Sequence, residues 1–206
     1  MSIGIDAGDS PPRTLARRAA RLVTEVFAPA VWAAVMPLVI AVHAASGVAA
    51  GLAWGAFAAV FSSVIPYGII WLGVRRGQLT DHHIGRREQR RRPLLLGLAC
   101  VLIGITALVL LRAPRELIAM VVVMFVVGLG ATLVNHYWKL SIHAAVASGS
   151  VAVLVLVFGP ALLAGAALVA LVGWSRVVLR DHTTAQVLAG TCAGAVLAAP
   201  TFALLG

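Results

Sequence analysis

Long apolar runs, each followed by a short polar stretch, make up most of the chain after about residue 25. A helix needs about 20 mostly apolar residues to cross the hydrocarbon core of a bilayer, so runs of this length predict membrane-spanning helices. The pattern therefore predicts an all-α, polytopic transmembrane helical bundle. Since some runs are short, we expect six to seven spans, with one segment tilted or re-entrant at the lower count. The runs are approximately 26–46, 49–74, 94–112, 117–136, 143–158, 160–179 and 183–204.

The first 24 residues differ from the rest of the chain. Residues 1–24 form a polar, basic tail that contains a Pro11-Pro12 pair, and we expect it to be partly disordered. Its arginine-rich part suits a turn or helix that lies in the membrane interface. The apolar run after it is longer than the roughly 7–15 residues of a signal-peptide core, which predicts a retained first span. Residues 25–206 are expected to form one transmembrane domain.

Composition supports the membrane assignment. Hydrophobic residues make up 61% of the 206 residues and charged residues 11%, whereas a soluble domain carries about 25% charged residues. In so apolar a chain, the net charge of +9 favours anionic lipid head groups or a phosphorylated substrate as partners over nucleic acid. Cys100 and Cys192 both lie in apolar runs, so neither a disulfide nor a metal site is indicated.

Three polar clusters interrupt the apolar background and hold the candidate chemistry. The first cluster covers residues 81–93, the second 139–143 and the third 175–186. Two apolar runs separate the first cluster from the second, and two more separate the second from the third. An even number of crossings returns the chain to the same membrane surface, so we expect the clusters to form one site. Polar groups are costly inside a bilayer, and those retained there are functional candidates.

Basic residues flank the cluster-bearing ends of the runs far more often than the opposite ends. Cytoplasmic loops carry an excess of Lys and Arg, so this bias predicts a site that faces the cytoplasm. We expect the membrane to be a bacterial plasma membrane. The opposite ends carry Arg112 and Arg115, and the cluster-bearing ends carry Arg13, Arg17, Arg18, Arg21, Arg75, Arg76, Arg86, Arg87, Arg90, Arg91, Arg92, Lys139, Arg176 and Arg180.

The third cluster reads Ser175-Arg176-x5-His182-x3-Gln186 and is the most specific of the three. Residues four apart share a helix face, so Gln186 can contact His182 and fix the orientation of its imidazole. Arg176 can present two donors to phosphate oxygens. A snorkelling arginine and a histidine at a helix cap would explain the same residues without a site.

The second cluster, Lys139-x-Ser141-x-His143, brings an ammonium, a hydroxyl and an imidazole within five positions. With Tyr137 and Trp138 before it, the cluster also suits an anchoring belt at the head groups. Such a belt accounts for Trp138 but requires neither Ser141 nor His143.

The first cluster combines many arginines with acidic and amide side chains. A positive loop at the cytoplasmic surface explains the arginines alone. Asp81, Glu88 and Gln89 are not needed by such a loop, and an arginine held by a carboxylate is a pre-organised phosphate clamp. Both interpretations stay open for this cluster.

Together, the clusters resemble the motifs of the type 2 phosphatidic acid phosphatase superfamily, which also contains the vanadium haloperoxidases. The family pattern is Lys-x6-Arg-Pro, then Pro-Ser-Gly-His, then Ser-Arg-x5-His-x3-Asp. The chain matches this pattern at Arg92-Pro93, Ser141, His143, Ser175, Arg176 and His182. It departs at Gly85, Leu140, Ile142 and Gln186, where the family has Lys, Pro, Gly and Asp.

The resemblance implies a metal-independent phosphatase that needs no cofactor and works through a phosphohistidine. His182 would attack phosphorus, Gln186 would orient it, and His143 would act as general acid and then as general base. The implied phosphate ligands are Arg87, Arg90, Lys139, Ser141 and Arg176, with Arg86, Arg92 and Ser175 as additional candidates. The implied substrates are lipid phosphates such as polyprenyl phosphates, polyprenyl diphosphates and phosphatidic acid.

Two other classes of function stay open. Gln186 in place of Asp motivates a non-catalytic binder of lipid phosphates, because an amide orients an imidazole without stabilising its charged form. The third class is a prenyltransferase. Such enzymes typically need Asp-rich magnesium sites, and the aspartates of this chain are Asp6, Asp9, Asp81 and Asp181.

Overall fold

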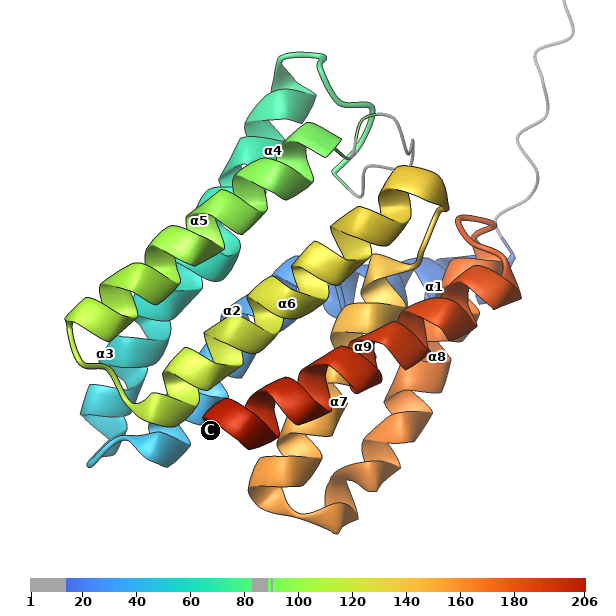
Figure 1. Ribbon diagram of the computed structural model, residues 1–206. Helices are drawn as coiled ribbons and strands as arrows, with labels where there is room; N and C mark the ends of the chain where they lie inside the picture. Colours follow the sequence, from blue (N-terminus) through green and yellow to red (C-terminus); the bar gives the residue numbers. More distant parts are fainter. Residues whose placement is uncertain (1–13, 83–88, 90) are drawn as a thin grey trace, which may run out of the picture.

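The computed structural model describes residues 14–82, 89 and 91–206, and all the regular secondary structure of these residues is helical (Figure 1). This finding confirms the expected all-α class. The α-helices are α1 (Leu15–Val26), α2 (Pro29–Ala44), α3 (Val48–Ala59), α4 (Ile65–Arg75), α5 (Arg91–Leu110), α6 (Arg115–Tyr137), α7 (Ile142–Phe158), α8 (Gly165–Val178) and α9 (Thr184–Leu205). A π-helix, η1 (Val60–Val64), joins α3 to α4, and a 3₁₀-helix, η3 (Pro160–Ala164), leads into α8.

Several of these segments are long and apolar enough to cross a membrane. Among the described residues they are Val48–Arg75, Arg91–Leu110, Arg115–Tyr137, Pro160–Val178 and Thr184–Leu205. The pair α1 and α2 would add a sixth if it counts as one span, although the two helices are bent by 44°. Helix α7, with 17 residues, is shorter. The structure thus supports a membrane protein with five candidate spans, or six with the bent pair; the remaining predicted run, 143–158, is the short helix α7.

The outward surface of the bundle is apolar, as is its core. Met36, Met120 and Val153, from three different helices, are almost fully buried in one core cluster. On α5, in contrast, Leu102 and Ile103 are 50% and 59% exposed. A helix that is apolar on all sides is either enclosed by protein or surrounded by lipid. The exposed leucine and isoleucine side chains fit the second situation.

Small residues let α7 and α9 pack closely. A Cβ at Gly190 would meet the backbone of Ser141, and a Cβ at Gly194 would meet the carbonyl oxygen of Ala145. Glycines four apart on one helix face allow two membrane helices to approach each other to backbone contact. At the same end, the Ser141 N–H donates to the Gln186 carbonyl at 3.3 Å. This packing places the start of α7 beside the start of α9.

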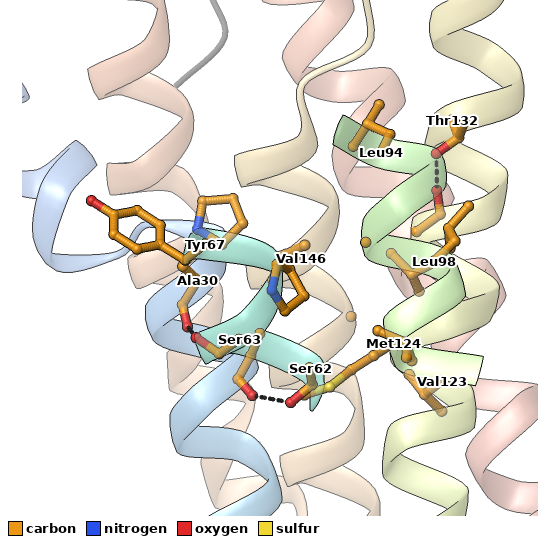
Figure 2. Close-up of a pocket in the computed structure, with 18 of the residues that line it drawn as sticks. Ala30, Ser62, Ser63, Tyr67, Leu94, Leu98, Val123, Met124, Thr132 and Val146 are labelled. Atoms are coloured by element: carbon orange, nitrogen blue, oxygen red, sulfur yellow. Dashed lines mark hydrogen bonds between the residues drawn. The ribbon is translucent and has the colours of Figure 1, made fainter. Parts of the chain in front are cut away.

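A π-helical turn fastens α4 to α2. Pro66 has no N–H to donate to the carbonyl of Ser62, so the regular helical ladder is interrupted there. The Ser62 hydroxyl donates to the Ala33 carbonyl at 2.8 Å, and the Ser63 hydroxyl donates to the Ala30 carbonyl at 2.7 Å (Figure 2). These bonds hold η1 against the first half of α2, where two adjoining cavities lie.

Candidate active site

A cavity of about 730 Å³ gathers one histidine from each of the three polar clusters. His82, His143 and His182 line it, together with Glu25 of α1. Its other walls are mostly apolar side chains of α2 and α4. His82 comes from the first cluster, His143 from the second and His182 from the third, so the fold brings residues distant in sequence to one space.

His182 is held by both its backbone and its side chain. It lies in the turn between α8 and α9, where its N–H donates to the Arg176 carbonyl at 3.2 Å. Its Nδ1 lies 3.2 Å from Oε1 of Gln186, so the contact expected between residues four apart is present. The same Oε1 accepts the Thr183 N–H at 3.1 Å, which identifies it as the amide oxygen. The Nδ1–H tautomer satisfies this oxygen, and the imidazole lone pair then lies on Nε2.

Gln186 serves the helix as well as the histidine. Its backbone N–H donates to the Thr183 hydroxyl at 3.3 Å, while its side chain accepts from the Thr183 backbone. This reciprocal capping box closes the N-terminus of α9. A glutamine at this position is therefore well suited to a helix start and also orients His182.

Ser141 and His143 begin α7. The Ser141 hydroxyl accepts the Ala144 N–H at 3.4 Å, so Ser141 is the helix N-cap. Ser141 is fully buried, whereas His143, 6% exposed, lines the cavity. The structure thus gives Ser141 a capping contact, and its expected bond to a phosphate stays a prediction.

Arg176 lies at the end of α8 beneath the turn that carries His182, and it is 3% exposed. Its Nη2 pairs with Oδ2 of Asp181 at 2.9 Å, and its Nη1 donates to the Thr24 hydroxyl at 3.1 Å. Because the Ser175 hydroxyl donates to the Val172 carbonyl at 2.7 Å, the Thr24 hydroxyl is the donor in its 3.1 Å contact with Ser175. Arg176 therefore sits in a buried chain of hydrogen bonds that ties α1 to α8.

The remaining phosphate-binding candidates divide into two groups. Lys139 is half-buried in the connection between α6 and α7, and Arg92 is exposed in the first turn of α5. Arg86, Arg87 and Arg90 lie outside the described residues. The structure places His143 and His182 at one cavity, with Gln186 in contact with His182. Arg176 and Ser175 instead contact Thr24, in the buried chain of hydrogen bonds between α1 and α8.

The sequence pattern did not single out Thr24, Glu25 or His82 for a role. His82 Nε2 lies 3.3 Å from both carboxylate oxygens of Glu25, and both residues line the cavity. Thr24 and Glu25 belong to α1, far from the clusters in sequence. Only the three-dimensional packing of α1 against α8 brings them to the site, so no local pattern could have indicated them.

A second, smaller pocket adjoins the histidine cavity. It has a volume of about 210 Å³ and lies among α2, η1, α5, α6 and α7 (Figure 2). Leu98, Met124 and Val146 are among its apolar walls (Figure 2). Ala30 and Tyr67 line both spaces. The site thus combines a polar end, with its histidines, and an apolar extension between helices.

Neither a metal site nor a similar protein of known function assigns a role to these residues. In the described part of the chain, no group of three or more His, Cys, Asp or Glu side chains is arranged to hold a metal ion. A scan against protein-family models and searches of curated proteins and of solved structures find no match to this chain. The likeness to the lipid phosphatase superfamily accordingly stands on the three motifs.

Proposed function

We propose that the protein is a membrane-embedded phosphatase that hydrolyses a phosphomonoester or diphosphate of a lipid through a phosphohistidine. One observation carries the proposal: His143, in the first turn of α7, and His182, in the turn before α9, line one cavity whose other walls are mostly apolar. A pair of histidines can supply a nucleophile and a general acid, and apolar walls suit a lipid chain. The order of the three motifs supports the same assignment.

The reaction has two balanced steps. In the first, Nε2 of His182 attacks phosphorus, the bond from phosphorus to the leaving oxygen breaks, and His143 donates a proton to that oxygen. In the second, His143 takes a proton from water, whose oxygen attacks phosphorus and releases His182 and inorganic phosphate. Gln186 holds Nδ1–H throughout, at the 3.2 Å contact seen here.

Positive charge near the site stabilises the transferring phosphoryl group. We assign this role to Arg87, Arg90 and Lys139, with Arg86 and Arg92 as further candidates. We also assign Arg176 to this group as a phosphate ligand, which requires one of its Nη atoms to exchange its contact with Thr24 or Asp181 for a phosphate oxygen. Ser141 is assigned a hydrogen bond to the phosphate, with Ser175 as a further candidate, and both side chains are fully buried in the structure.

The lipid chain would occupy the apolar part of the cavity. Val31 and Val35 of α2 and Val64 of η1 line the cavity and are also 42%, 44% and 60% exposed, so the space opens sideways between α2 and η1. In a bilayer this opening faces the acyl chains. A substrate could therefore enter from the bilayer and place its phosphate at the histidines and its chain in the cavity and the adjoining small pocket. The basic residues near the histidine end favour the cytoplasmic side.

Phosphate release tests the proposal directly. The detergent-purified protein is incubated, with EDTA present, with polyprenyl phosphate, polyprenyl diphosphate, phosphatidic acid and phosphatidylglycerophosphate. We expect release of inorganic phosphate from at least one of these lipids, at a rate that EDTA does not change. Activity lost on adding EDTA would instead favour magnesium-dependent chemistry on a prenyl diphosphate.

A non-catalytic lipid-phosphate binder is the second candidate. The favouring observation is that the group on Nδ1 of His182 is the neutral amide of Gln186, shared with the Thr183 N–H. A neutral partner does not stabilise an imidazolium as a carboxylate does. Intact protein that binds these lipids and releases no phosphate from any of them would establish this alternative, and Gln186→Asp would then be the informative variant.

Filling the small pocket is expected to lower kcat/KM for long-chain substrates and to leave it unchanged for short-chain ones. Gly97 lines this pocket, and a Cβ there would meet only the Pro66 Cβ, at 3.8 Å, which is an ordinary contact. Gly97→Leu adds four carbons to the pocket and displaces the chain atoms that would occupy it. At about 0.8 kcal/mol per buried methylene, we expect kcat/KM for a long-chain phosphate to fall roughly tenfold or more.

The controls for this prediction are a short substrate and a smaller side chain. Hydrolysis of a short-chain phosphate should be unchanged in Gly97→Leu, because its chain ends before the small pocket. Gly97→Ala should behave as the wild type with both substrates. Equal losses on long and short substrates would show that the pocket does not hold the chain.

A further inference from the structure

Helix α1 presents three distinct faces. Ala20 and Thr24 are buried against the bundle. On the opposite face, Leu15, Leu22 and Val26 are 83%, 65% and 48% exposed. Positions 15, 22 and 26 fall on one side of a helix with 3.6 residues per turn, so these side chains form one apolar stripe. The outward stripe is defined here as these three residues.

Arginines occupy the flank between the two faces. Arg17, Arg18 and Arg21 project along one side of α1, where Glu25 also lies, one turn after Arg21; Arg18 and Arg21 are exposed, and Arg17, next to Thr24, is half-buried. The described part of α1 thus has an apolar stripe with a cationic border. A lipid-facing stripe with basic residues beside it is the pattern of a helix lying in the membrane interface.

Buried hydrogen bonds fix which face of α1 points outward. Thr24 contacts both Ser175 and Arg176 of α8 at 3.1 Å, and α1 lies beside α8 in Figure 1. With Thr24 directed inward, the outward stripe must point away from the bundle. The bend of 44° after α1 then separates its direction from that of α2.

Neither water nor the hydrocarbon core suits such a surface. Water would leave the outward stripe exposed to solvent, and the hydrocarbon would surround three charged arginine side chains. The outward stripe and the arginines both find a suitable environment at the boundary between acyl chains and head groups. There the stripe enters the acyl layer and the arginines reach lipid phosphates.

We propose that α1 is a docking helix for an anionic membrane leaflet, with Arg17, Arg18 and Arg21 on lipid phosphates. Lipids with net negative charge are the partner, because three arginines against one glutamate, Glu25, leave this flank with an excess positive charge that zwitterionic head groups do not balance. The same helix carries Thr24, which holds Arg176, whose carbonyl in turn accepts the His182 N–H. Binding of the leaflet therefore steadies the turn between α8 and α9.

Hydrogen–deuterium exchange of the full chain in lipid nanodiscs tests this proposal without using enzymatic activity. One set of discs contains phosphatidylcholine, and the other contains phosphatidylcholine with phosphatidylglycerol. In the anionic discs we expect the amides of residues 15–26 to exchange about fivefold more slowly, and those of Asp181 and His182 to slow in parallel. The triple variant Arg17→Gln, Arg18→Gln, Arg21→Gln should lose both differences.

Three further variants complete the test. Arg112→Gln, a charge removed from the turn between α5 and α6, should keep the wild-type response. Thr24→Val should keep the response of α1 and lose that of Asp181 and His182, and Thr24→Ser should restore it. Equal exchange in the two kinds of disc, or a lipid response that survives in the triple variant, would overturn the anionic docking. A turn that responds equally in Thr24→Val would overturn the link to Arg176.

Discussion

Replacing His182 with alanine is expected to reduce phosphate release on the order of 10³-fold or more, because the variant lacks the atom that attacks phosphorus. The fold should survive. His182 lies in a turn, and the backbone bonds that hold this turn, from the Asp181 and His182 N–H groups to the Arg176 carbonyl, do not involve the imidazole. Inorganic phosphate release and thermal unfolding in detergent are measured on the same preparation.

The matched control is His136→Ala. His136 is an exposed histidine near the end of α6, where its ring packs edge-on against Tyr137 at 4.7 Å between centroids. It does not belong to the cavity lining, so its loss should leave turnover unchanged. Unaltered turnover in His182→Ala would exclude a phosphohistidine at this position, whereas inactivity of both variants would show that the loss of activity is not specific to His182.

The helical part of the fold could be predicted well because it depends on local composition. The run predicted at 183–204 is the helix Thr184–Leu205, and the run at 117–136 is Arg115–Tyr137. Differences arise where a helix extends beyond the apolar run. Helix α5 begins at Arg91 because a charged first turn can remain in the helix outside the hydrocarbon layer.

The candidate site could be predicted only as far as its contacts are local. The contact between His182 and Gln186 spans one helical turn, so the spacing indicated it. The bonds from Thr24 to Ser175 and Arg176 span 151 and 152 positions, and no periodicity encodes them. Ser141 illustrates a further limit, since a serine before a helix serves as an N-cap whether or not it also meets a ligand.

The prediction with the largest expected effect on stability concerns Gly194. Gly→Ala within a helix normally stabilises it by roughly 0.5–1 kcal/mol, because glycine loses more backbone freedom on folding. At Gly194 we expect the opposite effect, so that Gly194→Ala destabilises the protein. An added Cβ would meet the carbonyl oxygen of Ala145 and the hydroxyl oxygen of Ser148, which itself donates to the Thr191 carbonyl at 2.8 Å. Since a backbone carbonyl cannot rotate away, α7 and α9 must separate, at a cost of about 1–3 kcal/mol.

Gly68→Ala provides the matched control, because a Cβ at Gly68 meets no described atom within 4 Å. We expect a lower thermal midpoint in detergent for Gly194→Ala and an equal or higher one for Gly68→Ala. Separation of α7 from α9 also moves His143 away from His182, so phosphate release by Gly194→Ala should fall even at temperatures where the protein stays folded. A Gly194→Ala protein as stable and active as the wild type would show that this helix contact does not set the geometry of the site.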